Sequence, residues 1–77
     1  MNSVLNVEEI HMAFGEYIKK AREKNKMTQQ ELADKVGLSQ SYIGRIESGL
    51  RKIDLGIAIK LCDAVGMDVR DFAHKYL

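Results

Sequence analysis

Residues 28–49, TQQELADKVGLSQSYIGRIESG, restrict the possible folds of this 77-residue chain more than any other segment. Thr28 stands three positions before Glu31, which is the spacing of a capping box at the start of a helix. Gly37 suits the left-handed conformation that ends a helix, and Ser39 is a preferred N-cap for a second helix. Two short helices joined by a tight turn containing glycine form a helix-turn-helix motif, whose second helix can lie in the DNA major groove. The segment therefore predicts double-stranded DNA as a partner.

The rest of the chain carries signals for three further helices. Asn6 and Glu9 can form another capping box, which begins a helix, and Asp54 can cap a later one. The chain has no proline and few aromatic residues, which favours an all-α protein, and it is long enough for one core. We expect one five-helix helix-turn-helix domain over residues 1–77, with a core of about residues 7–76 and frayed residues 1–5. The expected helices cover about residues 7–24, 29–36 and 40–48, a segment after Asp54, and about residues 68–76.

Composition excludes several classes of protein. The single Cys62 excludes an intramolecular disulfide framework and fits a reducing cytoplasm. No apolar run approaches the ~20 residues needed to cross a bilayer. No basic residue precedes Lys19, so the N-terminus differs from a secretory signal. We therefore expect a soluble cytoplasmic protein with no membrane partner.

The run TQQELADKVGLSQSYIGRIESG resembles the helix-turn-helix of the lambda-repressor-like proteins, the Cro/C1 or XRE type of bacteria and phages. Downstream, Asp54-Leu55, Lys60-Leu61, the segment AVGMD at residues 64–68 and Asp71-Phe72 are similar to that family's fourth and fifth helices. The resemblance covers roughly residues 14–73. The sequence departs from the family pattern at Ile53, where many members carry proline. A second departure is Gly56, a glycine inside the fourth helix. The resemblance implies a compact lambda-repressor-like domain that regulates transcription in the bacterial cytoplasm and is encoded by a bacterium or a phage.

The second helix of the motif carries the candidates for reading DNA bases. Leu38, Ile43 and Ile46 are predicted to face the core, which leaves a polar face opposite them. Glutamine can bond adenine and arginine can bond guanine in the major groove, each through two hydrogen bonds. A glycine would let helix and groove approach closely. The alternative is an ordinary polar surface. We expect the bases to be contacted by Ser39, Gln40, Ser41, Gly44 and Arg45.

Candidates for phosphate contacts flank that helix. The start of the motif's first helix offers unpaired N–H groups and a partial positive charge, which suit a phosphate. Residues 16–52 hold nine Lys/Arg and five Asp/Glu, a net charge of +4, whereas the two ends together carry −3. The resemblance implies phosphate contacts at the start of the motif's first helix and in the loop after its second helix. We expect these contacts from Thr28, Gln29, Tyr42, Arg51 and Lys52; alternatively, Tyr42 packs on the preceding helix, and the two cations are solvated loop charges.

Two charged residues lie beside apolar helix positions. Arg22 follows Ile18 by four residues and Glu47 follows Ile43 by four, so each lies at the margin of an apolar stripe. A buried charge needs a partner. We expect a structural ion pair between Arg22 and Glu47, as the resemblance also implies, and the alternative is two exposed, unpaired side chains.

The sequence offers little for catalysis. His11 and His74 lack metal-ligand spacing with each other or with Cys62. Cys62 lies on an apolar stripe, where a small core residue is expected rather than a nucleophile. The chain has no glycine-rich phosphate loop and no nucleophile motif. We expect no metal, no cofactor and no enzymatic activity.

These observations predict a sequence-specific transcriptional regulator, and the resemblance implies either a Cro-like repressor or a restriction–modification controller. It would bind a near-palindromic operator as a homodimer, because one domain reads few base pairs, and would repress or activate by blocking or touching polymerase. The alternative is an antitoxin-type protein whose main partner is a toxin. A fragment of a longer regulator is a third possibility, against which Met1 and an end just after the fifth helix argue.

The fifth helix is the expected dimer interface. It carries more apolar side chains than a domain of this size is expected to bury, and an apolar patch at a surface commonly marks an association site. The rival interpretation is that these residues fold back on the first helix. The expected interface residues are Met67, Val69, Phe72, Ala73, Tyr76 and Leu77.

Overall fold

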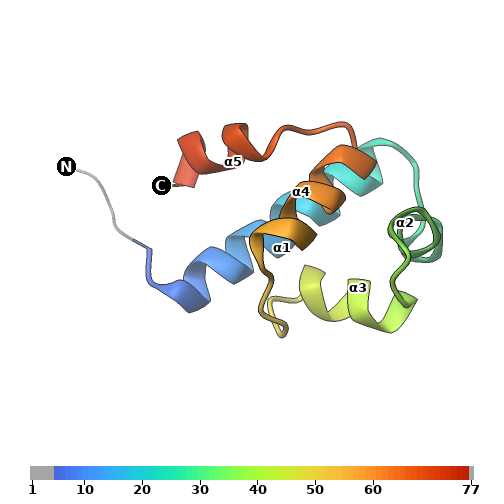
Figure 1. The fold of residues 1–77 in the computed structure, drawn as a ribbon, viewed down its shortest axis with the longest axis horizontal. Coiled ribbons are helices and arrows are strands. Elements are labelled where there is room, and N and C mark those ends of the chain that lie inside the picture. The colour runs from blue at the N-terminus through green and yellow to red at the C-terminus, as the bar shows by residue number, and fades with distance from the viewer. Residues whose placement is uncertain (1–4, 77) are drawn as a thin grey trace.

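Five helices follow one another in the computed structural model, which describes residues 5–76 (Figure 1). No strand occurs within these residues, so the predicted all-α fold is confirmed. Residues 1–4 and 77 lie outside the described residues, and with them most of the predicted fraying of residues 1–5 and the interface role of Leu77. The helices are α1 (Val7–Lys24), α2 (Gln29–Val36), α3 (Gln40–Glu47), α4 (Leu55–Ala64) and α5 (Val69–Tyr76).

Local hydrogen bonds set the starts of the first four helices. Asn6 and Glu9 form the predicted capping box of α1, with the Glu9 backbone N–H donating to Asn6 Oδ1 at 2.8 Å. Thr28 forms the same box with Glu31 at the start of α2. The side chains of Ser39 and Asp54 accept N–H groups of α3 and α4 respectively. The caps that the sequence predicted are therefore confirmed.

The core lies between α1 and the other four helices. Phe14 and Ile18 of α1 are fully buried, together with Leu32, Ile43 and Leu61 from three other helices. Each helix thus buries one apolar face, and burial at about 25 cal/mol per Å² of apolar surface supplies most of the stability. This core holds the α2–α3 motif against α1.

Gly15 of α1 lies where α1 and α3 cross. A Cβ atom added at Gly15 would overlap the carbonyl oxygen of Ile46 and lie close to the backbone of Glu47. The two backbones can approach this closely because glycine has no side chain. No local pattern in the sequence marks Gly15, whose backbone neighbours Ile46 and Glu47 lie at the end of α3.

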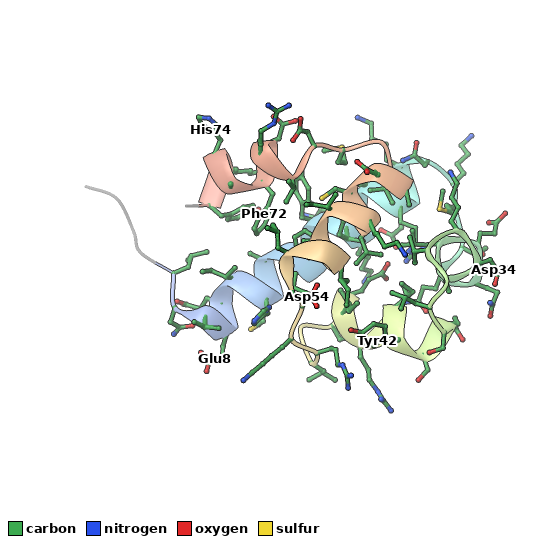
Figure 2. The ribbon with its side chains drawn as sticks, in the orientation of Figure 1. Glu8, Asp34, Tyr42, Asp54, Phe72 and His74 are labelled. Atoms are coloured by element: carbon green, nitrogen blue, oxygen red, sulfur yellow. The ribbon has the colours of Figure 1, made fainter. Side chains whose placement is uncertain are left out.

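The fifth helix folds back onto the body of the molecule. Phe72 is 4% exposed, and its ring meets that of Phe14 edge-on, with centroids 5.2 Å apart. Tyr76 packs on Phe72 at 4.8 Å between ring centroids, and Figure 2 shows Phe72 between α5 and α1. Phe72 is therefore a core residue, which corrects its assignment to a dimer interface. The aromatic side chains of α1 and α5 cover one another within one chain.

Candidate nucleic-acid interface

The α2–α3 pair forms a tight helix-turn-helix. Gly37 ends α2 with φ +73°, the left-handed conformation predicted for it, and the Leu38 N–H donates to the Ala33 carbonyl oxygen at 3.0 Å. This turn directs α3 across α2, and Ile43 and Ile46 of α3 are buried in the core. The opposite face of α3 is thereby directed outward.

The predicted base-reading residues gather on that outward face of α3. Ser41 and Arg45 are exposed, as is Gln40 at the helix start, whereas Gly44 is half-buried. Ser39, the N-cap, uses its hydroxyl oxygen to accept the Tyr42 N–H at 3.1 Å. Figure 1 shows α3 along the lower edge of the molecule and α5 along the upper edge. Because the two helices lie on opposite sides, the α3 face stays clear of α5.

The predicted phosphate contacts lie on both sides of the α3 face. Thr28 is the N-cap of α2, and Gln29 follows it, half-buried. Arg51 and Lys52 are exposed in the loop after α3, and the Arg51 guanidinium lies 4.8 Å from the centroid of the half-buried Tyr42 ring. Tyr42 also packs against the core. A cation over an aromatic face is attracted to its ring electrons, so this contact favours one orientation of Arg51 beside α3.

Arg22 and Glu47 meet beneath this face. The Arg22 Nε atom lies 2.6 Å from Glu47 Oε2, Nη2 lies 3.0 Å from Glu47 Oε1, and Nη1 donates to the Met27 carbonyl oxygen at 2.7 Å. The two side chains are 10% and 2% exposed. The hydrogen bond from Arg22 to Glu47 raises the pKa of the guanidinium, although burial alone would lower it. The pair connects α1 to the last turn of α3, and Arg22 also provides a hydrogen-bond donor for the Met27 carbonyl oxygen in the turn before α2.

A second set of hydrogen bonds extends from this ion pair to the surface. Gln29 Nε2 donates to Glu47 Oε1 at 3.0 Å, and Gln40 Nε2 donates to Gln29 Oε1 at 2.8 Å. The sequence indicates Gln29 and Gln40 only as separate DNA contacts and does not reveal the hydrogen bond between them. Each glutamine occupies the first position of its helix, and this shared position is the one feature of the sequence that could have indicated their contact.

Other chemistry is not evident in the part of the chain that the structure describes. Among these residues no three His, Cys, Asp or Glu side chains gather to hold a metal ion, and none of the helices is long and apolar enough to cross a membrane. Cys62 is buried in α4, and this burial raises the pKa of its thiol to about 11. The thiol is therefore protonated near neutral pH and is a poor nucleophile.

A short helix that presents polar side chains outward from a rigid two-helix scaffold defines a DNA-binding domain of the helix-turn-helix class. The profile of the helix-turn-helix family matches residues 18–72. The chain is 33% identical over 63 residues to the control protein C.BamHI of Bacillus amyloliquefaciens, a match that covers 80% of this chain and 78% of that protein. The chain belongs to the helix-turn-helix family of the Cro/C1 (XRE) type, whose members are DNA-binding transcriptional regulators.

Two further comparisons extend this result. An uncharacterized HTH-type transcriptional regulator of Sinorhizobium fredii, y4dL, is 36% identical over 52 residues, which are 68% of this chain and 26% of that one. The chain thus spans about a quarter of the length of that relative. The restriction-modification controller protein C.Esp1396I, solved as a tetramer with its natural 35 base-pair operator, superposes with a TM-score of 0.75 at 26% identity, over 86% of this chain and 87% of that chain.

Proposed function

We propose that this protein is a sequence-specific regulator of the restriction–modification controller or Cro-like repressor type, which binds a near-palindromic operator as a homodimer. The observation that carries this proposal is the outward polar face of α3, held from beneath by the Arg22–Glu47 pair. The likeness to C.BamHI and to operator-bound C.Esp1396I supports the controller type over an antitoxin whose main partner is a toxin. The protein acts on DNA in the bacterial cytoplasm and has no enzymatic activity.

The α3 face reads the bases and its surroundings hold the phosphates. Gln40 and Arg45 carry the groups suited to adenine and guanine, while Gly44 lets the helix approach the groove closely. The N-terminus of α2 and the cations of the α3–α4 loop contact the backbone on either side. The proposed base-reading set is Ser39, Gln40, Ser41, Gly44 and Arg45, and the proposed phosphate set is Thr28, Gln29, Tyr42, Arg51 and Lys52.

Replacement of Gln40 by Ala should relax the DNA preference at one base pair. We expect a loss of about 1–3 kcal/mol of binding free energy on the preferred site, because the alanine cannot bond a base. Lys52→Ala is the matched variant of a residue proposed to contact DNA phosphate. It should weaken binding to all sequences alike and reduce the slope of log binding constant against log salt concentration by about one unit in magnitude. Selection of DNA from a random pool, followed by salt-dependent binding measurements, checks both. If Gln40→Ala lowers the affinity for every DNA sequence equally, Gln40 contacts only the DNA phosphate backbone and does not read a base.

The proposed homodimer interface lies on α4 and α5 and leaves the α3 face free. Leu55 and Ile59 of α4 are 69% and 42% exposed, and they are four residues apart on one helical face. An apolar groove of α1, α4 and α5 lies at the start of this face, lined by Leu55, Val69 and Ala73 among others. We propose that a second copy covers it in a two-fold interface that extends the predicted α5 surface of Met67, Val69, Ala73 and Tyr76 onto α4. The two α3 helices would then lie about one DNA turn apart, ~34–36 Å.

Charges on the α4 face should prevent dimerisation. We expect the Leu55→Glu, Ile59→Glu variant to sediment as a monomer at micromolar concentration, because four carboxylates would be desolvated in the interface. Leu50→Glu is the matched control, since Leu50 is 79% exposed but lies in the α3–α4 loop, and it should leave the dimer intact. A monomeric wild type, or a double variant that dimerises unchanged, would overturn this interface.

A further inference from the structure

A groove between α1 and α5 has no part in the proposed DNA interface. Its volume is about 230 Å³, and its walls come from α1, from the turn between α4 and α5 and from the end of α5. One of these walls, α5, lies along the edge of the molecule opposite α3 (Figure 1). Among the described residues, those that line the groove are distinct from the ones proposed to contact DNA. The ligand of this groove must therefore be inferred from its own side chains.

The walls of the groove are apolar and partly aromatic. Ala21 is buried, whereas Tyr17, Met67 and Tyr76 are half-buried. The Tyr17 hydroxyl oxygen is shielded from solvent, so Tyr17 contributes its ring to the wall. An apolar cavity of ~150 Å³ is large enough to hold benzene. At about 230 Å³ the groove therefore has room for one aromatic ring or two fused rings.

The rim of the groove is positively charged. Three exposed lysines line it, Lys20 and Lys24 of α1 and Lys75 of α5. The one carboxylate among the lining residues is that of Glu16, so three ammonium groups against one carboxylate leave an excess of two positive charges. The Lys75 Nζ atom lies 5.5 Å from the centroid of the Tyr76 ring, where the ring electrons attract it. A cationic rim of this kind favours an anionic group on the ligand.

We propose that the α1–α5 groove is a binding site for a small aromatic carboxylate, whose ring packs against the apolar walls and whose carboxylate lies among the three lysines. The walls alone would accept any ring of the right size, and the lysines alone would attract any anion. Together they select a molecule that has both parts. The carboxylate stays at the rim, where water and the ammonium groups solvate it, and only the ring leaves water. This inference goes beyond the proposed function, because it requires neither DNA nor base reading.

The test uses naphthoate as the probe and naphthamide, its neutral amide, as the matched control ligand. We expect naphthoate to bind one site per chain with a dissociation constant below about 1 mM in low salt. It should bind at least about fivefold more tightly than naphthamide, because only the carboxylate is attracted by the lysines. An NMR titration should place the largest shifts in α1 and α5. Inorganic phosphate should give no saturable shifts there, since it has no apolar part.

The titration is made on two forms of the protein. Met67 and Tyr76 also belong to the proposed dimer surface, so a second copy could cover part of the groove. The Leu55→Glu, Ile59→Glu variant, designed to be monomeric, therefore accompanies the wild type, and its two substitutions lie outside the groove. Saturable naphthoate binding by either form supports the site.

Variants of the rim test the role of charge. Lys20→Gln combined with Lys24→Gln should weaken naphthoate binding about five- to tenfold and leave naphthamide binding unchanged. Lys19→Gln combined with Lys35→Gln is the matched control. It removes the same charge from exposed lysines outside the groove and should change the affinity less than about twofold. Glu16→Gln should act in the opposite direction and strengthen naphthoate binding about twofold, because it removes a carboxylate from the rim.

The folded state should not confuse these results. All five substituted side chains are exposed, so each variant should unfold at about the wild-type denaturant concentration. The inference is overturned if neither form binds naphthoate, if naphthamide binds equally well, or if the two lysine pairs have equal effects. Shifts centred on α3 instead of on the groove would also overturn it. A wild type without any base preference would contradict the proposed function and leave this site unaffected.

Discussion

Replacement of Glu47 by Ala is expected to lower the free energy of unfolding by about 3–5 kcal/mol. The change leaves the Arg22 guanidinium, which is 10% exposed, without the carboxylate that accepts two of its hydrogen bonds. A domain of this size has a total stability of about 4–12 kcal/mol. The variant should therefore lose a large share of its stability, and chemical denaturation measures the difference directly.

Glu23→Ala is the matched control for the buried pair. The Glu23 carboxylate lies 4.0 Å from Nη2 of the same arginine, but its side chain is 57% exposed. An exposed ion pair contributes little, because water and salt screen it, so the control should lose under about 0.5 kcal/mol. A loss of that size for Glu47→Ala would contradict the architectural role of the pair. A double variant with Met for Arg22 and Leu for Glu47 should recover most of the stability, since no uncompensated charge is then buried.

Replacement of Gly15 by Ala is expected to be the most damaging conservative change in α1, with a loss of about 3 kcal/mol. The added methyl group would overlap the Ile46 carbonyl oxygen, and a backbone atom cannot rotate away as a side chain does. The α1 and α3 helices would have to separate, which also strains the Arg22–Glu47 contact. Thermal or chemical unfolding of the variant provides the measurement.

Gly44→Ala is the control for this prediction. The nearest heavy atom to a Cβ at Gly44 is the Gln29 Oε1 atom at 3.7 Å, an ordinary contact distance. Because alanine is favoured over glycine inside a helix, this variant should gain up to about 1 kcal/mol in stability. It should nevertheless bind DNA less tightly, if the groove approaches α3 as proposed. Equal stability of the Gly15 and Gly44 variants would show that the α1–α3 contact can relax.

The positions of the helices could be read from the sequence because their ends depend on neighbours three or four residues away. The boxes of Asn6 with Glu9 and of Thr28 with Glu31, and the left-handed Gly37, involve no distant residue. The apolar spacing within each helix likewise indicated which face is buried. For these reasons the fold class, the helix bounds and the outward face of α3 were predicted well. The meeting of Arg22 with Glu47 was expected partly from that spacing and partly from the family resemblance.

The contacts between residues far apart in the chain were decided only by the tertiary structure. Gly15 has no local signal, because the need for glycine arises from the α3 backbone that α1 crosses. Phe72 was assigned to an interface because helical spacing identifies an apolar face but not the residues that cover it. In the structure, Phe14 and Tyr17 of α1 pack against Phe72. The link from Glu47 through Gln29 to Gln40 needs three helices packed in one arrangement. Sequence thus determined the elements and their faces, while packing determined which faces meet and how the Gln40 amide is oriented.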